Sequence, residues 1–278
     1  MPRDRRAGPR GSRLPARRRW GQNFLASGET AERIVDAAGV GPNDTVLEIG
    51  PGDGALTRPL ADRAAAVAAV EIDPLRAAAL AEEFAGDPRV CILPGDVLGR
   101  PFRAWLDAAG VSAPALLVAN LPYNVATPIL TAAVESPETI FRSVATVQRE
   151  VARRFVARPG DESYGYLSVR VAAHATGRIL FDLPPGAFRP RPKVFSSVVE
   201  LTPRPSPIDP ARARRALALA SLGFNARRKT LANALASAGP RAAWERALEA
   251  IGRGPKTRAE ELSLDDFLAL AASEETAA

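Results

Sequence analysis

Short apolar runs alternate with segments of helical spacing over the first two thirds of the chain. Four of these runs lie at Thr45–Gly50, Ala66–Asp73, Arg89–Asp96 and Ala115–Pro122, and their continuous apolar stretches are typical of strands buried on both faces. Segments of helical spacing or composition lie between them, at 54–64, 74–86 and 101–110. This alternation predicts βαβ units around a mostly parallel sheet, an α/β fold. Later apolar runs, which could complete the sheet, lie at 143–148, 177–183 and 194–201.

A proline-rich stretch, Leu201–Pro210, separates this region from a different pattern. Proline is excluded from helix interiors and central strands, so we interpret the stretch as a linker. Beyond it every segment has helical spacing, which predicts a small all-α domain. The predicted division is therefore a basic tail at 1–19, an α/β domain at 20–203 and a helical domain at 204–278.

Composition narrows the chemistry that the chain can perform. The 278 residues are 46% hydrophobic, carry a formal net charge of +6, and include one cysteine and one histidine. A disulfide framework, a cysteine-rich zinc site and a histidine-based triad are therefore excluded, and we expect a site without metal. No apolar run is long enough for a membrane span, and the positive charge favours a nucleic-acid partner. The arginine-rich tail predicts a disordered segment, with an organelle transit peptide as the alternative.

The first predicted strand is followed by a glycine-rich turn, LEIGPGDGALT. Gly50 and Gly52 allow a tight turn and a close approach of the backbone to a ligand. Glu71 ends the next strand, where an acidic residue binds ribose hydroxyls in nucleotide-binding sheets. The spacing also fits a dinucleotide fingerprint, so NAD remains open on these residues alone.

The third and fourth predicted strands end in GDVL and in Asn120-Leu121-Pro122-Tyr123. Asp96 can accept a hydrogen bond from an adenine amino group. An amide oxygen beside an aromatic ring suits a planar base that carries an amino group, although a plain strand end with a turn is the alternative. A hydride-transfer site would also need a proton donor or acceptor for its substrate. No His, Cys or Lys stands at these strand ends, although a Tyr does, and this disfavours NAD.

Taken together, these motifs resemble those of the bacterial small-subunit rRNA adenine N6-dimethyltransferases, the KsgA family. The resemblance runs from about Trp20 to about Leu270. It is carried by GQNFL, EIGPGDGALT, VEIDP, GDVL, NLPYNVATPIL, VQREVARR, YGYLSV, FRPRPKVFSSVV, FNARRKTLANAL and RAEELSLDDFLAL, in that order. The resemblance implies a Rossmann-like class I methyltransferase with a seven-stranded sheet, and S-adenosylmethionine as methyl donor.

The resemblance also implies roles for individual residues. The cofactor would be bound by Asn23, Leu25, Gly50, Gly52, Glu71, Asp96 and Asn120. The Asn120 side chain and the Leu121 carbonyl would accept the hydrogens of the target N6, Pro122 would fix the turn, and Tyr123 would stack on the base. Phe188 would hold the other face of the base, with a core aromatic as the alternative. RNA contacts are expected from Arg189, Arg191 and Lys193, and from Arg227, Arg228 and Lys229, which are predicted to lie in one helical turn. A solvated basic face is the alternative for either cluster.

The implied substrate is a pair of adjacent adenosines in the 3′-terminal stem-loop of small-subunit rRNA, within an assembling ribosomal subunit in the cytoplasm. The implied enzyme is a monomer. Alternatives are the macrolide-resistance type of large-subunit rRNA methyltransferase, a DNA adenine methyltransferase, a small-molecule methyltransferase, and an assembly factor that is mainly non-catalytic. The chain departs from the family at Phe195, where an acid is common, and at Gly252-Arg253-Gly254.

Overall fold

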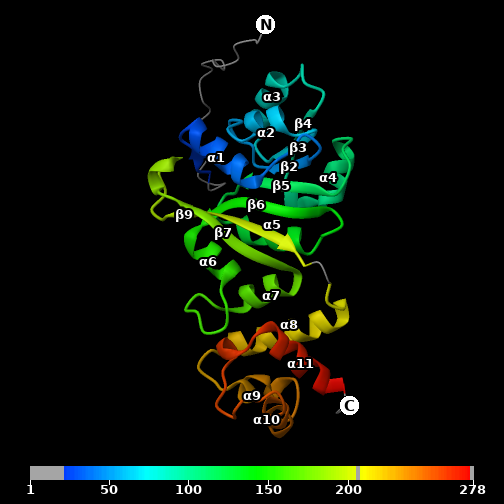
Figure 1. Cartoon of the computed structure of the whole chain (residues 1–278), viewed down its shortest axis with the longest axis vertical. Helices are drawn as coiled ribbons and strands as arrows, with labels where there is room; N and C mark the ends of the chain where they lie inside the picture. Colours follow the sequence, from blue (N-terminus) through cyan, green and yellow to red (C-terminus); the bar gives the residue numbers. More distant parts are fainter. Residues whose placement is uncertain (1–21, 205–206, 276–278) are drawn as a thin grey trace.

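The computed structural model of the protein describes residues 22–204 and 207–275, and the predicted basic tail at 1–19 lies outside them. A seven-stranded sheet has the order β4-β3-β2-β5-β6-β9-β7 (Figure 1). Its strands are β2 (Thr45–Ile49), β3 (Ala66–Glu71), β4 (Val90–Pro94), β5 (Ala115–Asn120), β6 (Ile140–Gln148), β7 (Ala175–Leu183) and β9 (Ser196–Pro203). Neighbours from β4 to β6 run parallel, and β9 is antiparallel to both β6 and β7. The predicted α/β fold with a mostly parallel sheet is confirmed.

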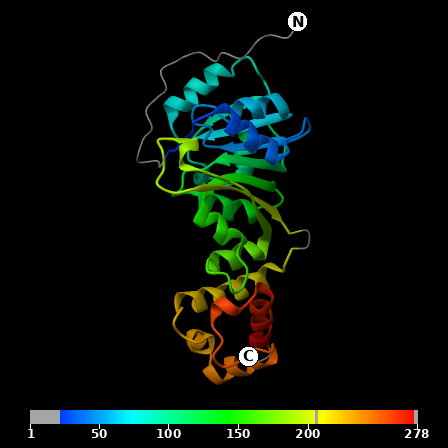
Figure 2. The same ribbon diagram turned by 60° about the vertical axis from the view of Figure 1, so that its left-hand side comes forward.

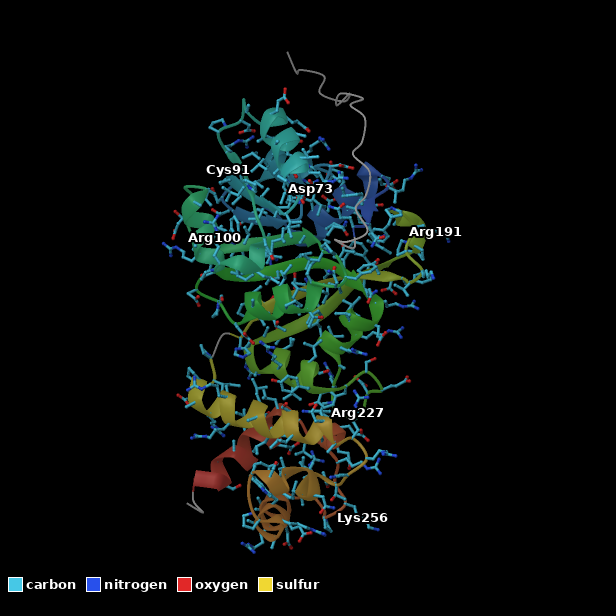
Figure 3. All side chains as sticks on the ribbon, turned by 180° about the vertical axis from the view of Figure 1, so that it is seen from behind. Asp73, Cys91, Arg100, Arg191, Arg227 and Lys256 are labelled. Atoms are coloured by element: carbon cyan, nitrogen blue, oxygen red, sulfur yellow. The ribbon has the colours of Figure 1, made fainter. Side chains whose placement is uncertain are left out.

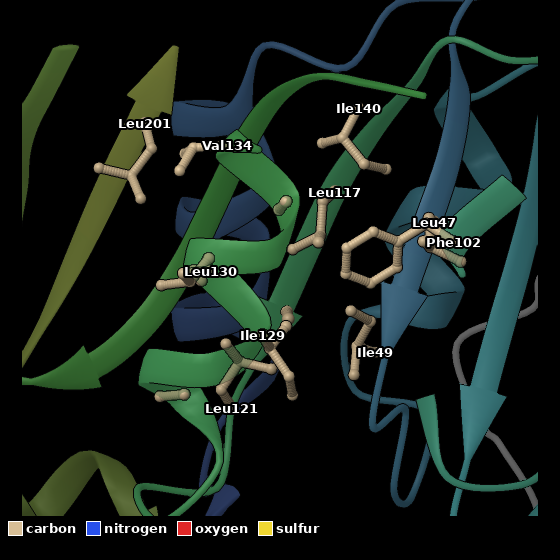
Figure 4. Packing of buried hydrophobic residues seen from close by; sticks show 14 of the residues in the cluster. Leu47, Ile49, Phe102, Leu117, Leu121, Ile129, Leu130, Val134, Ile140 and Leu201 are labelled. Carbon is tan, nitrogen blue, oxygen red and sulfur yellow. The ribbon is translucent and has the colours of Figure 1, made fainter. Parts of the chain in front are cut away.

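The central strands are buried on both faces, as their continuous apolar runs predicted. Leu47 and Ile49 of β2 pack into one core cluster and Val46 into another. On β5, Leu117 joins the first cluster and Leu116 the second. Figure 4 shows Leu47, Ile49 and Leu117 packing with side chains of the covering helices. Alternate side chains of a strand point to opposite faces, so one apolar run fills both cores.

Helices cover the two faces of this sheet. On one face lie α1 (Gly28–Ala38) and α2 (Thr57–Arg63), and on the other α4 (Phe102–Ala108) and α5 (Ala126–Val134), with α6 (Arg149–Val156) and α7 (Tyr166–His174) beside them. The helix α3 (Pro74–Glu83) begins with Asp73 as its N-cap, whose carboxylate accepts from the N–H of Leu75 at 3.1 Å. Proline at the first position of that helix needs no N–H partner, so the sequence Asp-Pro starts the helix at a defined residue.

The C-terminal helices form a separate core, here called the C-terminal core, at the far end of the molecule (Figures 1 and 2). They are α8 (Pro210–Asn225), α9 (Leu231–Ala234), α10 (Arg241–Ala250) and α11 (Leu264–Glu275). This core extends into the loop before α7, where the Tyr164 hydroxyl donates to the carbonyl of Leu262 at 2.7 Å and its ring lies 5.8 Å from that of Phe224. The predicted linker is shorter than expected, because β9 continues to Pro203. The division of the chain at 203/204 remains a prediction.

Within the described ranges, no helix combines the length and the apolar character that a membrane crossing requires. Over the same residues, no group of three or more His, Cys, Asp or Glu side chains is arranged to hold a metal ion.

Candidate active site at the carboxyl edge of the sheet

The strand register aligns four predicted site residues along one edge of the sheet. Ile49 pairs with Val70 on β3 and with Ala119 on β5, so the next residue, Gly50, follows in line with Glu71 and Asn120. Glu71 in turn pairs with Pro94, and Asp96 follows two residues later. The carboxyl edge of a parallel sheet is where α/β folds bind ligands, so the four residues share the expected position for a site.

The glycine turn after β2 is held close to the end of β3. Gly50 and Gly52 have φ angles of 69° and 59°, a backbone region that favours glycine. A β-carbon built on Gly50 meets no atom within 4 Å, so a ligand could approach this part of the backbone closely. A β-carbon on Gly52 would lie 2.8 Å from the Phe24 ring, which packs directly on the turn.

The Glu71 carboxylate is buried and accepts two backbone hydrogen bonds. The N–H of Gly52 donates at 2.8 Å and the N–H of Asp73 at 2.9 Å. Burial raises the pKa of the Glu71 carboxyl, and the hydrogen bonds from Asp73 and Gly52 oppose that rise. Each carboxylate oxygen can accept more than one hydrogen bond, so Glu71 keeps capacity for a ligand hydroxyl. Asp96 is exposed, with one oxygen accepting from the N–H of Leu98 at 3.0 Å.

Asn120 is tied to the N-terminal segment of the described chain. Its Nδ2 donates to the backbone carbonyl of Asn23 at 2.8 Å. A carbonyl oxygen can only accept, so the contact fixes which end of the amide faces Asn23 and turns Oδ1 elsewhere. The structure thus brings together two predicted site residues that are 97 positions apart in sequence.

The rest of the Asn-Leu-Pro-Tyr turn is anchored to the sheet. Leu121 is 2% exposed, and its N–H donates to the carbonyl of Thr146 at 3.3 Å. The Tyr123 hydroxyl lies 2.7 Å from Ser196 Oγ on β9. Burial raises the pKa of the Tyr123 phenol, and the hydrogen bond with Ser196 opposes that rise. The ring is therefore held at one end while remaining partly exposed.

Phe188 lies next to this N-terminal segment. The short strand β8 (Phe188–Arg189) pairs antiparallel with β1 (Phe24–Leu25), with Leu25 opposite Phe188. Both Leu25 and Phe188 are buried, at 8% and 2% exposure, and pack in the same core cluster. In this arrangement Phe188 is a core aromatic, and its role against a base remains a prediction.

The predicted RNA-contacting residues are all exposed and lie in two segments. Arg189 ends β8, and Arg191 and Lys193 lie between β8 and β9. Arg227, Arg228 and Lys229 were expected in a helical turn, but α8 ends at Asn225 and α9 begins at Leu231, so they occupy the turn between these helices. That turn allows Leu231 to be buried completely and its N–H to donate to the carbonyl of Thr257 at 2.7 Å.

One groove connects the two basic segments. Its volume is about 620 Å³. Its lining includes Arg149, Arg153, Arg154, Lys193, Phe195 and Arg227. Figure 3 shows Arg191 and Arg227, one from each segment, on the same side of the molecule.

Sequence reasoning missed a buried arginine beside the glycine turn. Arg76 on α3 is 1% exposed, pairs with Asp53 of the turn, and lies 3.8 Å from a carboxylate oxygen of Asp73. Its guanidinium carbon is 4.3 Å from the centre of the Phe24 ring. Arg76 therefore joins the glycine turn, the end of β3 and the N-terminal segment. Nothing in the sequence around this arginine indicates the role. Its partners Phe24, Asp53 and Asp73 do lie within the motifs GQNFL, EIGPGDGALT and VEIDP.

Glu48 on β2 is expected to make the stability of the fold depend on pH. Burial raises the pKa of this carboxyl to about 8, with the negative charge of Glu71 adding to the rise and the Thr57 hydroxyl and Arg58 opposing it. The folded protein therefore holds a proton that the unfolded chain releases near pH 4–5, so stability should fall as pH rises from about 5 to about 8. Glu48→Gln should remove most of this fall, as measured by urea unfolding across that range. If the unfolding free energies of the two proteins changed with pH in parallel, Glu48 would not be the group responsible.

Comparison with known proteins identifies the family. The family model described as ribosomal RNA adenine dimethylase matches residues 13–275. The protein named ribosomal RNA small subunit methyltransferase A from Synechococcus sp. (strain JA-3-3Ab) is 44% identical over 263 residues, with 91% of each chain covered. The protein of the same name from Methylococcus capsulatus (strain ATCC 33009 / NCIMB 11132 / Bath) is 40% identical over 254 residues, with 91% of this chain and 96% of the relative covered.

Two solved structures have the same overall fold. The 23S rRNA methyltransferase ErmE is 30% identical, with a TM-score of 0.70, and the alignment covers 91% of this chain and 100% of ErmE. A dimethyladenosine transferase from Plasmodium falciparum is 22% identical, with a TM-score of 0.73 over 89% of this chain and 95% of that chain. The resemblance inferred from the motifs is confirmed by the family match and by the curated relatives. This chain belongs to the ribosomal RNA adenine dimethylase family.

Proposed function

We propose that this protein transfers methyl groups from S-adenosylmethionine to N6 of two adjacent adenosines in the 3′-terminal stem-loop of small-subunit rRNA. The observation that carries the proposal is the alignment of Asp96, Glu71, Gly50 and Asn120 along one sheet edge, with Asn120 oriented by Asn23. The small-subunit assignment is supported by relatives at 40–44% identity, compared with 30% for the 23S rRNA enzyme.

The residues at this edge fit S-adenosylmethionine. Glu71 offers a carboxylate for the ribose hydroxyls, exposed Asp96 an acceptor for the adenine amino group, and open backbone at Gly50 a surface for the methionine part. The full proposed set is Asn23, Leu25, Gly50, Gly52, Glu71, Asp96 and Asn120. When bound, S-adenosylmethionine supplies an electrophilic methyl group on sulfur. No metal is proposed.

Asn120 and Leu121 would prepare the target nitrogen for attack. The lone pair of an adenine N6 is delocalised into the ring, which makes the nitrogen a poor nucleophile. Asn120 Oδ1 and the Leu121 carbonyl would accept hydrogen bonds from its two N–H groups and so favour a pyramidal nitrogen. Positioning of this kind supplies much of the rate acceleration in a reaction that needs no strong base before attack.

Aromatic side chains would hold the base in place. Tyr123 would stack on one face, with its ring anchored by the 2.7 Å contact to Ser196. Stacking on an aromatic ring is worth roughly 1–3 kcal/mol per base. Phe188 would hold the other face, and because it is 2% exposed its ring would first have to turn toward the base. The adenosine itself must leave its stack to reach the site.

The exposed basic residues would dock the enzyme on RNA through phosphate contacts. They are Arg189, Arg191, Lys193, Arg227, Arg228 and Lys229. The helical region at 204–278 would serve as an RNA-docking domain. A basic surface of this extent suits an assembling ribosomal subunit in the cytoplasm better than a single hairpin, and we propose that the enzyme acts there as a monomer.

The test incubates the purified protein and labelled S-adenosylmethionine with each of two substrates. These are unmethylated small ribosomal subunits and protein-free large-subunit rRNA. We expect N6,N6-dimethyladenosine in digests of the small-subunit RNA alone. Product on the large-subunit RNA would shift the assignment to the macrolide-resistance type. If neither RNA is methylated although the protein binds small subunits, a mainly non-catalytic assembly factor becomes the better description.

A further inference from the structure

Phe195 is an exposed aromatic side chain with no role in the site described above. It is 42% exposed and lines the groove that connects the two basic segments. The guanidinium carbon of Arg149 lies 4.6 Å from the centre of its ring. A single exposed apolar residue is ordinary, but an exposed ring paired with a guanidinium inside a groove forms a flat surface suited to stacking.

The chain holds this pair beside the Asn-Leu-Pro-Tyr turn. Gln148 at the end of β6 pairs with Ser196 at the start of β9, and Ser196 is the partner of the Tyr123 hydroxyl. Arg149 follows Gln148 and Phe195 precedes Ser196, and the N–H of Arg149 donates to the carbonyl of Phe195 at 3.0 Å. The Phe195 ring therefore belongs to the residue next to the one that anchors the proposed base-stacking tyrosine.

The charge of the groove suits a nucleic-acid strand. Five cationic side chains line it, namely Arg149, Arg153, Arg154, Lys193 and Arg227, against the carboxylates of Glu150 and Glu162. Glu150 forms an ion pair with Arg154, and Asp182, which lies outside the lining, is 3.9 Å from Arg149. The other cations, Arg153, Lys193 and Arg227, still outnumber the one other carboxylate of the lining, Glu162. The volume of about 620 Å³ lies within the range of ligand-binding clefts, roughly 300–1,000 Å³.

We propose that Phe195 and Arg149 form a stacking platform for an unpaired RNA base next to the target adenosine. This proposal rests on the proposed function, because turning one adenosine out of its stack exposes the faces of its neighbours. Unstacked bases are bound in other RNA-binding sites by aromatic rings and by arginine planes. The groove cations would contact the phosphates on either side, whereas stacking on the Phe195 ring adds affinity that does not depend on charge.

The experiment measures binding of unmethylated small ribosomal subunits across a series of salt concentrations. The proteins are the wild type, Phe195→Ala, Phe195→Trp and the control Leu75→Ala, which removes a 53% exposed apolar side chain from α3. We expect Phe195→Ala to lower affinity by about tenfold, with the slope against salt unchanged because no phosphate contact is lost. Phe195→Trp should restore wild-type affinity, and Leu75→Ala should match the wild type.

Two results would overturn the proposal of a stacking platform. Wild-type affinity in Phe195→Ala would mean that no base stacks there. A shallower salt slope in Phe195→Ala that Phe195→Trp does not restore would mean that the ring only holds Arg149 against a phosphate. Methyl transfer by the wild type to the same subunits separates the two proposals. If the wild type transfers no methyl group, the proposed function fails, whereas transfer with unaltered binding by Phe195→Ala rejects only the platform.

Discussion

The Asn120→Ala variant is expected to lose methyl transfer by at least about a hundredfold while binding small ribosomal subunits almost as the wild type does. The substitution removes Oδ1, the proposed acceptor for one N6 hydrogen, and leaves only the Leu121 carbonyl. It also removes the 2.8 Å bond to the Asn23 carbonyl that orients the amide. Docking should persist, because the exposed basic residues proposed to contact phosphates lie outside this turn. Single-turnover transfer and subunit binding would be measured on the same preparation.

The control for this variant is Asn43→Ala. Asn43 is an exposed asparagine that precedes β2, at the opposite edge of the sheet, so the same substitution there should leave transfer unchanged. Asn120 also belongs to the proposed cofactor set, so transfer must be measured at saturating S-adenosylmethionine. Near-normal turnover under that condition would contradict the proposed role of Asn120 in positioning the target nitrogen.

Arg76→Met should lower the free energy of unfolding by about 3 kcal/mol. Arg76 is 1% exposed and pairs with Asp53 and Asp73, and the Asp73 side chain is itself 2% exposed. Methionine fills a similar volume but leaves the buried Asp73 carboxylate without its cation. The loss of unfolding free energy should stay near the lower end of the range for breaking a buried ion pair, because the Asp53 side chain is 31% exposed and can be solvated. Urea unfolding at neutral pH measures the change.

Arg103→Met is the matched control for this substitution. Arg103 pairs with Asp107 at 2.8 Å on the surface of α4, with side chains that are 63% and 56% exposed. Surface pairs of this kind contribute little, so the change in unfolding free energy should stay within about 0.5 kcal/mol. Equal losses in the two variants would show that burial of Arg76 adds nothing to its ion pairs.

The strands at the site were predictable because their signal is local. The predicted run Thr45–Gly50 became β2 and Ala115–Pro122 became β5, each shifted by no more than two residues at its ends. A strand buried on both faces must be apolar at successive positions, so its own sequence reveals it. The order of elements then implies a parallel sheet, and a parallel sheet brings Gly50 and Asn120 to one edge.

The turn at 226–230 shows where local pattern was insufficient. The residues there are compatible with helix, and a helix was expected. The chain instead turns so that Leu231 enters the C-terminal core and its N–H donates to the carbonyl of Thr257, 26 residues away. Tertiary burial of a leucine outweighs the small differences in helix propensity over a few residues.

By itself the sequence determined the fold class, the glycine turn, the order of polar strand ends and the family. Only the tertiary structure decided that Asn23 meets Asn120, that Phe24 packs on Gly52, that Arg76 is buried beside them, and that one groove connects Lys193 with Arg227. The physical reason is the separation in sequence of the residues that make each contact. Periodicity and turn chemistry act between near neighbours, whereas these contacts join segments whose proximity depends on how the whole sheet and its helices pack.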